Sequence, residues 1–345
     1  MSENKSLFIW NNRSYSATEL VDLQEVPEHI ATVQSALRFC LSQDSEWTLQ
    51  TSGSTGAPKT LALSRAMIYG SARATLDAFE LVSGSKAALV LPAKYIGGFM
   101  MVVRAYIGQL TLHLCEPRAL PHVPEGLDFL PMTPAQFIAL KEAGKQLKVK
   151  NVLLGGSALP ARFDISSYSG VFIGYGMTET ASHVALRPLG GTFYTAVGAT
   201  EFSVNVDECL CISAPHLEIS KLQTQDRVRL LDKKRFNFEG RLDDVINSGG
   251  IKLHPEKFES VCDTHGIQTV MSSREHERYG QVPVMVVRRM EDVEDLKRAL
   301  RLWEGTALPK EACIVAEWPL LENGKLDRLK LQSFIKSHPD RLFRL

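Results

Sequence analysis

The sequence of 345 residues predicts an α/β protein, with a large layered α/β domain that includes a β-rich subdomain, followed by a small α+β domain. Up to residue 190, short apolar segments typical of strands alternate with helical patterns. Short alternating strand patterns then dominate, and a mixed helix and strand pattern begins after residue 240. A chain of this length has room for about two domains, so we divide it into residues 1–240 and 241–345.

The expected elements follow this division in order. Strands are expected at residues 6–10, 46–50, 60–63, 86–91, 110–114, 128–132, 151–154, 171–173, 201–206, 208–213 and 228–231, and near residues 269 and 284. Helices are expected at residues 27–42, 65–81, 99–107, 255–264 and 293–303, after Thr133 and after Asp327. Ser64 is an expected N-cap, and Thr133 with Gln136 forms a capping box around Pro134. In such a layered domain, the chemistry is expected on loops beyond the strand ends.

The bulk composition excludes several classes of partner. The chain has 39 basic and 39 acidic residues, so its net charge favours neither nucleic acid nor an acidic membrane. The six cysteines are scattered, which fits a reducing compartment. The first residues lack a signal-peptide pattern, and Arg104 interrupts the longest apolar run, so no membrane insertion is expected. We expect a soluble cytoplasmic protein, and the sequence leaves open whether it forms a homo-oligomer.

Residues 51–59 carry the strongest local signal for anion binding. This stretch lies between two expected strands and combines two glycines, four hydroxyl side chains and one lysine. Glycine backbones can turn successive N–H groups inward, which makes a concave site for phosphate oxygens. The expected phosphate-binding residues are Thr51, Ser52, Gly53, Ser54, Thr55, Gly56 and Lys59.

This loop differs from a Walker A loop, because Pro58 precedes Lys59 and a strand-like segment follows. It resembles instead the phosphate loop of the adenylate-forming superfamily, which includes acyl-CoA synthetases, firefly luciferase and peptide-synthetase adenylation domains. That resemblance implies ATP and Mg²⁺ as cofactors.

A second glycine-rich segment, residues 174–180, follows an apolar strand. It resembles the superfamily motif whose members are Gly174, Tyr175, Gly176, Met177, Thr178 and Glu179 in this chain. The resemblance implies that Tyr175 stacks on adenine, Thr178 contacts the α-phosphate and Glu179 binds magnesium. A carboxylate beside a polyphosphate is a suitable magnesium ligand.

Further segments match the superfamily in its order, and the resemblance implies a role for each. For the nucleotide, they are an adenine-side loop at Gly155, Gly156 and Ser157, a ribose contact at Asp226, and a ribose and phosphate contact at Arg241. Asp243 is the expected hinge pivot between the domains. On the small domain, Gly249 and Gly250 are expected to face coenzyme A, and Lys325 is the expected catalytic lysine. Gln225 stands where the superfamily usually has glycine. Members usually carry well over a hundred residues before the phosphate loop, so the resemblance also implies a shortened N-terminal subdomain.

The expected acid follows from the stretches that line the superfamily's acyl pocket. Residues 91–98, 99–105 and 178–187 resemble those of the o-succinylbenzoate–CoA ligases of menaquinone synthesis. A dicarboxylate keeps one carboxylate after the other is activated, and that group needs cationic or hydroxyl partners. The candidates are Lys94, Tyr95, Arg104, Ser182 and His183, with Arg187 nearby.

The implied reaction has two steps, in which the acid and ATP form an acyl-adenylate and pyrophosphate, and the thiol of coenzyme A then displaces AMP. Phosphoryl chemistry of this kind depends mainly on positioning and charge neutralisation. Two alternatives remain open from sequence: another acyl- or aryl-CoA synthetase or carrier-loading enzyme of the same superfamily, and a nucleotide-binding relative without catalysis.

Overall fold

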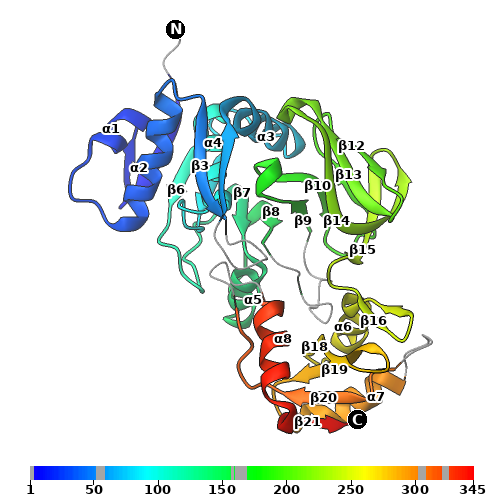
Figure 1. Ribbon diagram of the computed structural model, residues 1–345. Helices are drawn as coiled ribbons and strands as arrows, with labels where there is room; N and C mark the ends of the chain where they lie inside the picture. Colours follow the sequence, from blue (N-terminus) through cyan, green and yellow to red (C-terminus); the bar gives the residue numbers. More distant parts are fainter. Residues whose placement is uncertain (1–3, 52–58, 157–158, 160–168, 302–307, 321–325) are drawn as a thin grey trace.

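The computed structural model describes residues 4–51, 59–156, 159, 169–301, 308–320 and 326–345. Its strands form a 13-stranded sheet, a six-stranded sheet and a two-stranded ribbon (Figure 1). The last strand of the large sheet ends at Arg241, and the second sheet begins at Ile246. The overall class is therefore the mixed α/β arrangement that the sequence predicts.

Parallel strands form the centre of the large sheet. In chain order they are β1 (Leu7–Trp10), β5 (Lys86–Leu89), β6 (Thr111–Leu114), β7 (Leu127–Met132), β8 (Val149–Leu154) and β9 (Val171–Gly176). Their spatial order is β1-β6-β5-β7-β8-β9, and β2 (Arg13–Tyr15) pairs antiparallel with β1 at the edge. Because parallel strands end at the same edge, the loops after β5, β7, β8 and β9 gather on one side of the sheet.

In the described ranges, five helices accompany these strands: α1 (Ala17–Asp22), α2 (Glu28–Leu41), α3 (Arg65–Ala78), α4 (Ile96–Gly108) and α5 (Pro134–Glu142). Successive residues of a strand face opposite sides. Ala87 and Leu89 accordingly pack with α2, α3 and α4, whereas Ala88 and Val90 pack with α5. The helix α4 lies against both α2 and α3, so its middle is covered on all sides. Within the described ranges, no helix is both long and apolar enough to cross a bilayer.

The β-rich part continues the large sheet through antiparallel strands. These are β10 (His183–Pro188), β11 (Tyr194–Ala196), β12 (Glu201–Val204), β13 (Cys209–Ala214), β14 (Ile219–Asp232) and β15 (Arg235–Arg241). Two short 3-10 helices, η1 (Thr178–Thr180) and η2 (Pro215–Leu217), interrupt them. Backbone pairing is continuous from β9 to β12, so this part extends the sheet where the sequence predicted a subdomain packed upon it.

The ribbon of β3 (Glu46–Thr51) and β4 (Lys59–Ser64) confirms the two strands expected on either side of the phosphate loop. In its antiparallel register, the backbone of Thr51 lies opposite that of Lys59. Residues 52–58, with most of the expected phosphate-binding positions, lie outside the described residues.

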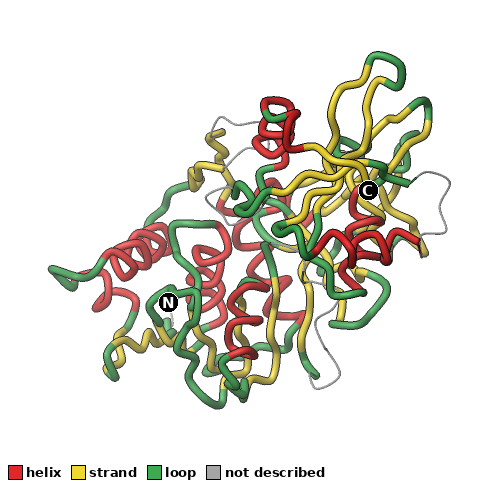
Figure 2. Tube along the Cα trace, turned by 90° about the horizontal axis from the view of Figure 1, so that it is seen from below, coloured by secondary structure: helices red, strands yellow, loops and turns green. Residues whose placement is uncertain are grey.

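The second sheet has helices of its own. Its elements are β16 (Ile246–Ser248), β17 (Ile251–Leu253), α6 (Pro255–Thr264), β18 (Val270–His276), β19 (Gly280–Val287), α7 (Asp292–Arg301), β20 (Glu311–Ile314), α8 (Arg328–Ser337), η3 (Pro339–Arg341) and β21 (Leu342–Arg344). Separate apolar clusters hold the helices to this sheet. Figure 1 shows this unit at one end of the molecule, and Figure 2 views the chain from that end.

Local sequence signals placed several boundaries well. The helix expected at residues 255–264 has these bounds, and the Thr133 capping box is present with both of its hydrogen bonds. Strand β9 is longer than expected, because it continues through Gly176 where we predicted a turn after residue 173. A Cβ at Gly176 would lie 2.2 Å from the carbonyl oxygen of Ser182. The glycine thus permits the close approach of β10 and does not end the strand.

Gly70 marks the closest approach between α3 and η2, and it provides a test of this packing. A Cβ at this position would lie 1.9 Å from the backbone oxygen of His216. We expect Gly70→Ala to displace the helix and lower the free energy of unfolding by about 1–3 kcal/mol, measured by chemical denaturation. Gly97→Ala in α4 is the control, since its Cβ would make only an ordinary 3.4 Å contact with Leu91. Equal losses for both variants would contradict the packing argument.

Candidate active site

The expected site loops do gather at the carboxyl edge of the parallel strands. Gly155 follows β8 directly, and its backbone N–H donates to the carbonyl oxygen of Met132 at the end of β7 (3.2 Å). Gly156 has φ +97°, a conformation that favours glycine. Gly176 closes β9 in the neighbouring position. The third residue of the adenine-side loop, Ser157, lies outside the described residues.

Four residues that the sequence assigned to nucleotide binding and to the hinge contact one another. The Tyr175 hydroxyl donates to Asp226 Oδ2 (2.5 Å), and Arg241 Nη1 donates to Asp226 Oδ1 (3.3 Å). Arg241 also holds Asp243 through Nε (2.8 Å) and Nη2 (2.6 Å). The antiparallel register of β14 and β15 sets Asp226 opposite Arg241. Tyr175, Asp226, Arg241 and Asp243 thus form one connected chain across three strands of the sheet.

Burial and charge define the protonation of this chain. Burial raises the pKa of the Tyr175 hydroxyl, and the neighbouring Asp226 carboxylate raises it further, so the phenol remains neutral. The hydrogen bond to Asp243 raises the pKa of Arg241, which therefore remains a cation. The Tyr175 ring packs edge-on against Phe236, with ring centroids 5.1 Å apart. The ring is held in place while its hydroxyl is tied to the carboxylate.

The turn after β9 positions Thr178 and Glu179 at the same edge. The Thr180 hydroxyl organises this turn, donating to a backbone carbonyl and accepting from the Met177 backbone N–H (3.0 Å). Strand β4 of the ribbon contacts η1, so the phosphate loop's second strand reaches this turn. Glu179 is exposed. Among the described residues, no group of three carboxylate, histidine or cysteine side chains could hold a metal by itself. An exposed carboxylate suits an ion that is shared with a polyphosphate.

Arg104 is the least expected feature of the molecule, because a guanidinium lies in the core. Its side chain is 1% exposed, in a run of α4 that is buried from Gly98 to Ala105. Nη2 donates to Ser182 Oγ (2.5 Å). Across the described part of the chain, Nε has no hydrogen-bond partner and no carboxylate forms an ion pair with this arginine. Burial lowers the pKa of Arg104 to about 9.

Ser182 and His183 continue from Arg104 into the core. Ser182 Oγ lies 3.2 Å from His183 Nδ1, and His183 Nε2 lies 3.4 Å from Thr75 Oγ1 on α3. Burial, together with the charge of Arg104, lowers the pKa of His183 to about 3, so the imidazole is neutral at neutral pH. The turn that delivers Ser182 includes Ala181 with φ +57°, a strained conformation for a residue with a Cβ.

The other two candidates for the acyl pocket lie differently. The Lys94 side chain is 51% exposed, and its ammonium is 3.8 Å from Glu28 Oε1. Tyr95 is exposed at the N-cap of α4. Arg104 lies about 12 Å further along the axis of this helix, counted from Ile96. The structure thus separates the two basic residues that the sequence grouped, because one faces solvent and the other faces the core.

The second sheet carries the remaining candidates. Gly249 (φ +59°) and Gly250 (φ +86°) form the turn between β16 and β17. Lys325 lies outside the described residues, but Leu320 and Leu326 on either side of that segment pair as an isolated bridge. Arg328 follows closely and is tied to Glu259 (2.9 Å) and Asp244 (3.4 Å). Arg328, close after the segment that contains Lys325, is thereby joined to the residues that follow Arg241.

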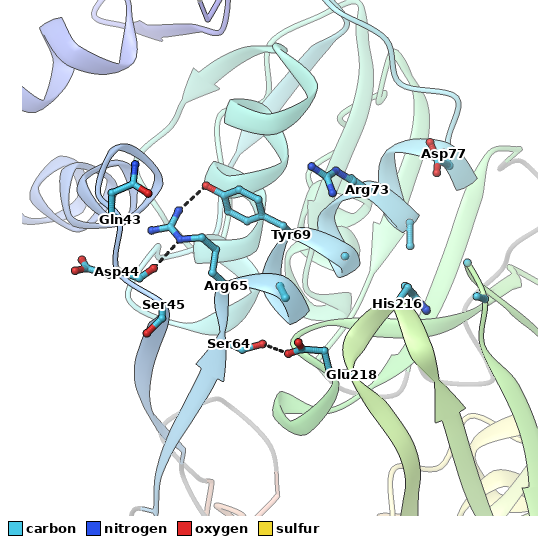
Figure 3. A pocket seen from close by; sticks show the side chains of 15 residues that line it. Gln43, Asp44, Ser45, Ser64, Arg65, Tyr69, Arg73, Asp77, His216 and Glu218 are labelled. Carbon is cyan, nitrogen blue, oxygen red and sulfur yellow. Dashed lines mark hydrogen bonds between the residues drawn. The ribbon is translucent and has the colours of Figure 1, made fainter. Parts of the chain in front are cut away.

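A surface pocket of about 950 Å³ lies away from these residues, along α3 from Arg65 to Asp77 (Figure 3). Arg65 crosses it with hydrogen bonds to the Tyr69 hydroxyl and the Asp44 carbonyl, and Ser64 is bonded to Glu218. Of the predicted site residues that the structure describes, none lines this pocket.

Comparison with known proteins agrees with the fold and the motifs. Residues 24–207, more than half of the chain, match the family described as AMP-binding enzyme. The chain belongs to this family.

Three relatives illustrate the similarity. A 2-succinylbenzoate–CoA ligase of Salmonella typhimurium is 28% identical over 272 residues, covering 72% of this chain and 59% of the relative. A probable 2-succinylbenzoate–CoA ligase of Mycobacterium tuberculosis is 26% identical, covering 90% of each chain. The crystal structure of an acyl-CoA synthetase (AMP-forming)/AMP-acid ligase II-like protein from Dyadobacter fermentans has a TM-score of 0.61 at 27% identity, covering 93% of this chain and 98% of that one. The chain therefore spans about three fifths of the Salmonella enzyme.

The contrast between Arg104 and a paired arginine yields a stability prediction. A buried cation without a carboxylate is costly, whereas removing one member of a buried ion pair leaves uncompensated charge. We expect Arg104→Met to leave the free energy of unfolding unchanged or to raise it by up to about 2 kcal/mol. Arg328→Met removes the partner of Glu259 and Asp244, and we expect it to lower the free energy of unfolding by about 2–3 kcal/mol. Urea denaturation without ligands measures both, and a large loss for Arg104→Met would show that this arginine is already well paired.

Proposed function

We propose that this chain is an ATP-dependent acid–CoA ligase that forms an acyl-adenylate and then a thioester, with o-succinylbenzoate as its acid. The buried, incompletely paired guanidinium of Arg104 carries the proposal. Among the described residues no carboxylate pairs with this buried cation, so a ligand that brings an anion to it would stabilise it. An acid with a second carboxylate supplies that anion, whereas a fatty acid would leave the charge unpaired. The 2-succinylbenzoate–CoA ligases to which the chain is similar support the same substrate.

The edge of the parallel strands is the proposed ATP site. We assign adenine to the ring of Tyr175 and the ribose hydroxyls to Asp226. In the described arrangement both Asp226 oxygens accept hydrogen bonds, from Tyr175 and Arg241. A ribose would therefore compete with these donors or share the carboxylate with them. Thr178 would contact the α-phosphate, while the backbone of residues 51–59 and Lys59 would hold the β- and γ-phosphates.

Glu179 would hold the magnesium ion that accompanies ATP. Bound magnesium would neutralise part of the phosphate charge. An oxygen of the acid then attacks the α-phosphorus, the bond to pyrophosphate breaks, and Lys325 stabilises the charge that develops. In the second step the coenzyme A sulfur attacks the acyl carbon and AMP leaves. The residues bind, orient and neutralise charge, and no side chain forms a covalent intermediate.

The proposed domains are residues 1–240 and 241–345, with Asp243 as the pivot. Lys325 and the Gly249–Gly250 turn belong to the same small domain, yet they would serve different steps at one site. We propose that the small domain rotates between adenylation and thioester formation. The short link between the two sheets, residues 242–245, supports a hinge at this place.

The substrate assignment predicts a selective effect of Arg104. Arg104→Met should lower kcat/KM for o-succinylbenzoate by about 10–100-fold, because a hydrogen bond to a charged group contributes about 1.5–3 kcal/mol. It should leave kcat/KM unchanged within about twofold for 4-oxo-4-phenylbutanoate, which is the same acid without its ring carboxylate. Pyrophosphate release is the measurement, and Lys94→Met is the control, since its ammonium faces solvent. If wild type used the monoacid as well as the diacid, o-succinylbenzoate would be the wrong substrate.

The rotation predicts that one lysine serves only the first step. Lys325→Ala should slow adenylation by about 10²–10³-fold, as expected for loss of one electrostatic stabiliser. It should leave thioester formation from supplied acyl-adenylate within about twofold of wild type. The matched control is Lys330→Ala, which removes an exposed lysine from the first turn of α8. Equal losses in both half-reactions would rule out alternating use of the small domain.

A further inference from the structure

Thr75 is a buried residue of α3 that belongs to no recognised motif, yet it ends the chain of polar groups that begins at Arg104. The groups run from Arg104 Nη2 to Ser182 Oγ (2.5 Å), to His183 Nδ1 (3.2 Å), and from His183 Nε2 to Thr75 Oγ1 (3.4 Å). Three distant segments of the sequence supply them, which are α3, α4 and the start of β10. Thr75 is 0% exposed, so its hydroxyl is out of reach of bulk water.

The direction of each hydrogen bond follows from the last member of the chain. The Thr75 hydroxyl donates to the backbone carbonyl of Ser71 (3.0 Å), and a carbonyl oxygen can only accept. A hydroxyl has one proton, so Thr75 Oγ1 can only accept from His183. His183 Nε2 must then carry the imidazole proton. A neutral imidazole has one N–H, and Nδ1 is therefore an acceptor.

The rest of the chain follows from this tautomer. With Nδ1 accepting, the Ser182 hydroxyl donates to His183, and its oxygen accepts from Arg104. In the opposite direction, Nδ1–H would donate to Ser182 and the Ser182 proton would need another acceptor. No such acceptor is found among the described residues. Only the first direction satisfies every buried hydroxyl and ring nitrogen of the chain.

We propose that Thr75 is a positioning residue for substrate binding, because it holds His183 as its Nε2–H tautomer. In that tautomer the Ser182 hydroxyl donates to His183, and the Ser182 oxygen accepts from Arg104. This inference rests on the proposed function, because it assigns the second anion of the acid to Arg104. Ser182 and His183 then do not donate to the anion. They orient the guanidinium, whose Nε remains buried and without a partner in the described chain. The anion is recognised by Arg104, and the recognition depends on the Thr75 hydroxyl, which is three hydrogen bonds away along this chain of polar groups.

The test compares Thr75→Val, which removes the hydroxyl at nearly constant shape, with Thr75→Ser, which keeps it. Steady-state pyrophosphate release at saturating ATP gives KM and kcat for o-succinylbenzoate and for 4-oxo-4-phenylbutanoate. We expect Thr75→Val to raise KM for the diacid about fivefold, as for the loss of one net hydrogen bond, with kcat within about twofold. KM for the monoacid should stay unchanged, and Thr75→Ser should behave as wild type within about twofold.

Thr200→Val is the matched control, because Thr200 is also 0% exposed and its hydroxyl donates to the carbonyl of Val197 (2.7 Å), away from His183. A merely structural role for Thr75 would raise KM or lower kcat equally for both acids, and that result would overturn the proposal. So would failure of Thr75→Ser to restore the diacid KM. A wild type without any preference for the diacid would instead refute the proposed substrate.

A second measurement tests the tautomer independently of any substrate. Nitrogen-15 NMR of histidine-labelled protein, assigned with His183→Gln, should show an Nε2–H tautomer for His183 in wild type and in Thr75→Ser. The Thr75→Val variant should show a changed tautomer population. An Nδ1–H tautomer in wild type would overturn the inference, whichever acid the enzyme prefers.

Discussion

The parallel pairing of β5, β7, β8 and β9 is the constraint on which the site depends. The chain that links two parallel strands must run from the carboxyl end of the first to the amino end of the second. The segments that follow neighbouring strands therefore all start at the same edge of the sheet, side by side. The segments that follow these four strands are far apart in the sequence and become adjacent for this reason alone. The antiparallel extension then turns β14 and β15 toward the same place and adds Asp226 and Arg241. Topology, more than any single contact, assembles the groups that would surround a nucleotide.

A second constraint is the placement of charge inside α4. A helix covered by two other helices and a sheet would ordinarily be apolar throughout, and α4 is apolar except at Arg104. The segment around it departs from regular structure where it must meet this charge. Ala181 has a positive φ of +57°, and β10 begins with a register shift between His183 and Ala185. Irregular backbone of this kind is typical of places where a fold holds a functional group at some expense of stability.

The sequence predicts those features of this molecule that depend on local residue patterns. Glycine-rich segments after apolar strands identified the edge, and capping signals at Ser64 and Thr133 placed the starts of two helices correctly. It could not predict which of Lys94, before α4, and Arg104, inside α4, is buried, because each is a single basic residue in an apolar stretch and only packing decides. The role of Thr75 could not be predicted from the sequence for a related reason. A single threonine in a helix belongs to no recognisable motif, and its partner His183 is 108 positions away. The strand order beyond β9 is likewise set by distant partners.

The direction of the hydrogen bonds also bears on how easily this pocket can change its acid during evolution. Ser182 donates to His183, His183 to Thr75, and Thr75 to a backbone carbonyl, so the polar chain satisfies its own donors without Arg104. Loss of the arginine leaves only one lone pair of Ser182 without a donor, which is a small penalty compared with a stranded proton or charge. If Arg104 binds the second carboxylate as proposed, a single codon change at position 104 would exchange an anion-binding pocket for an apolar one while the surrounding core persists. On the proposed function, enzymes for mono- and dicarboxylic acids would then differ by as little as one residue on this scaffold.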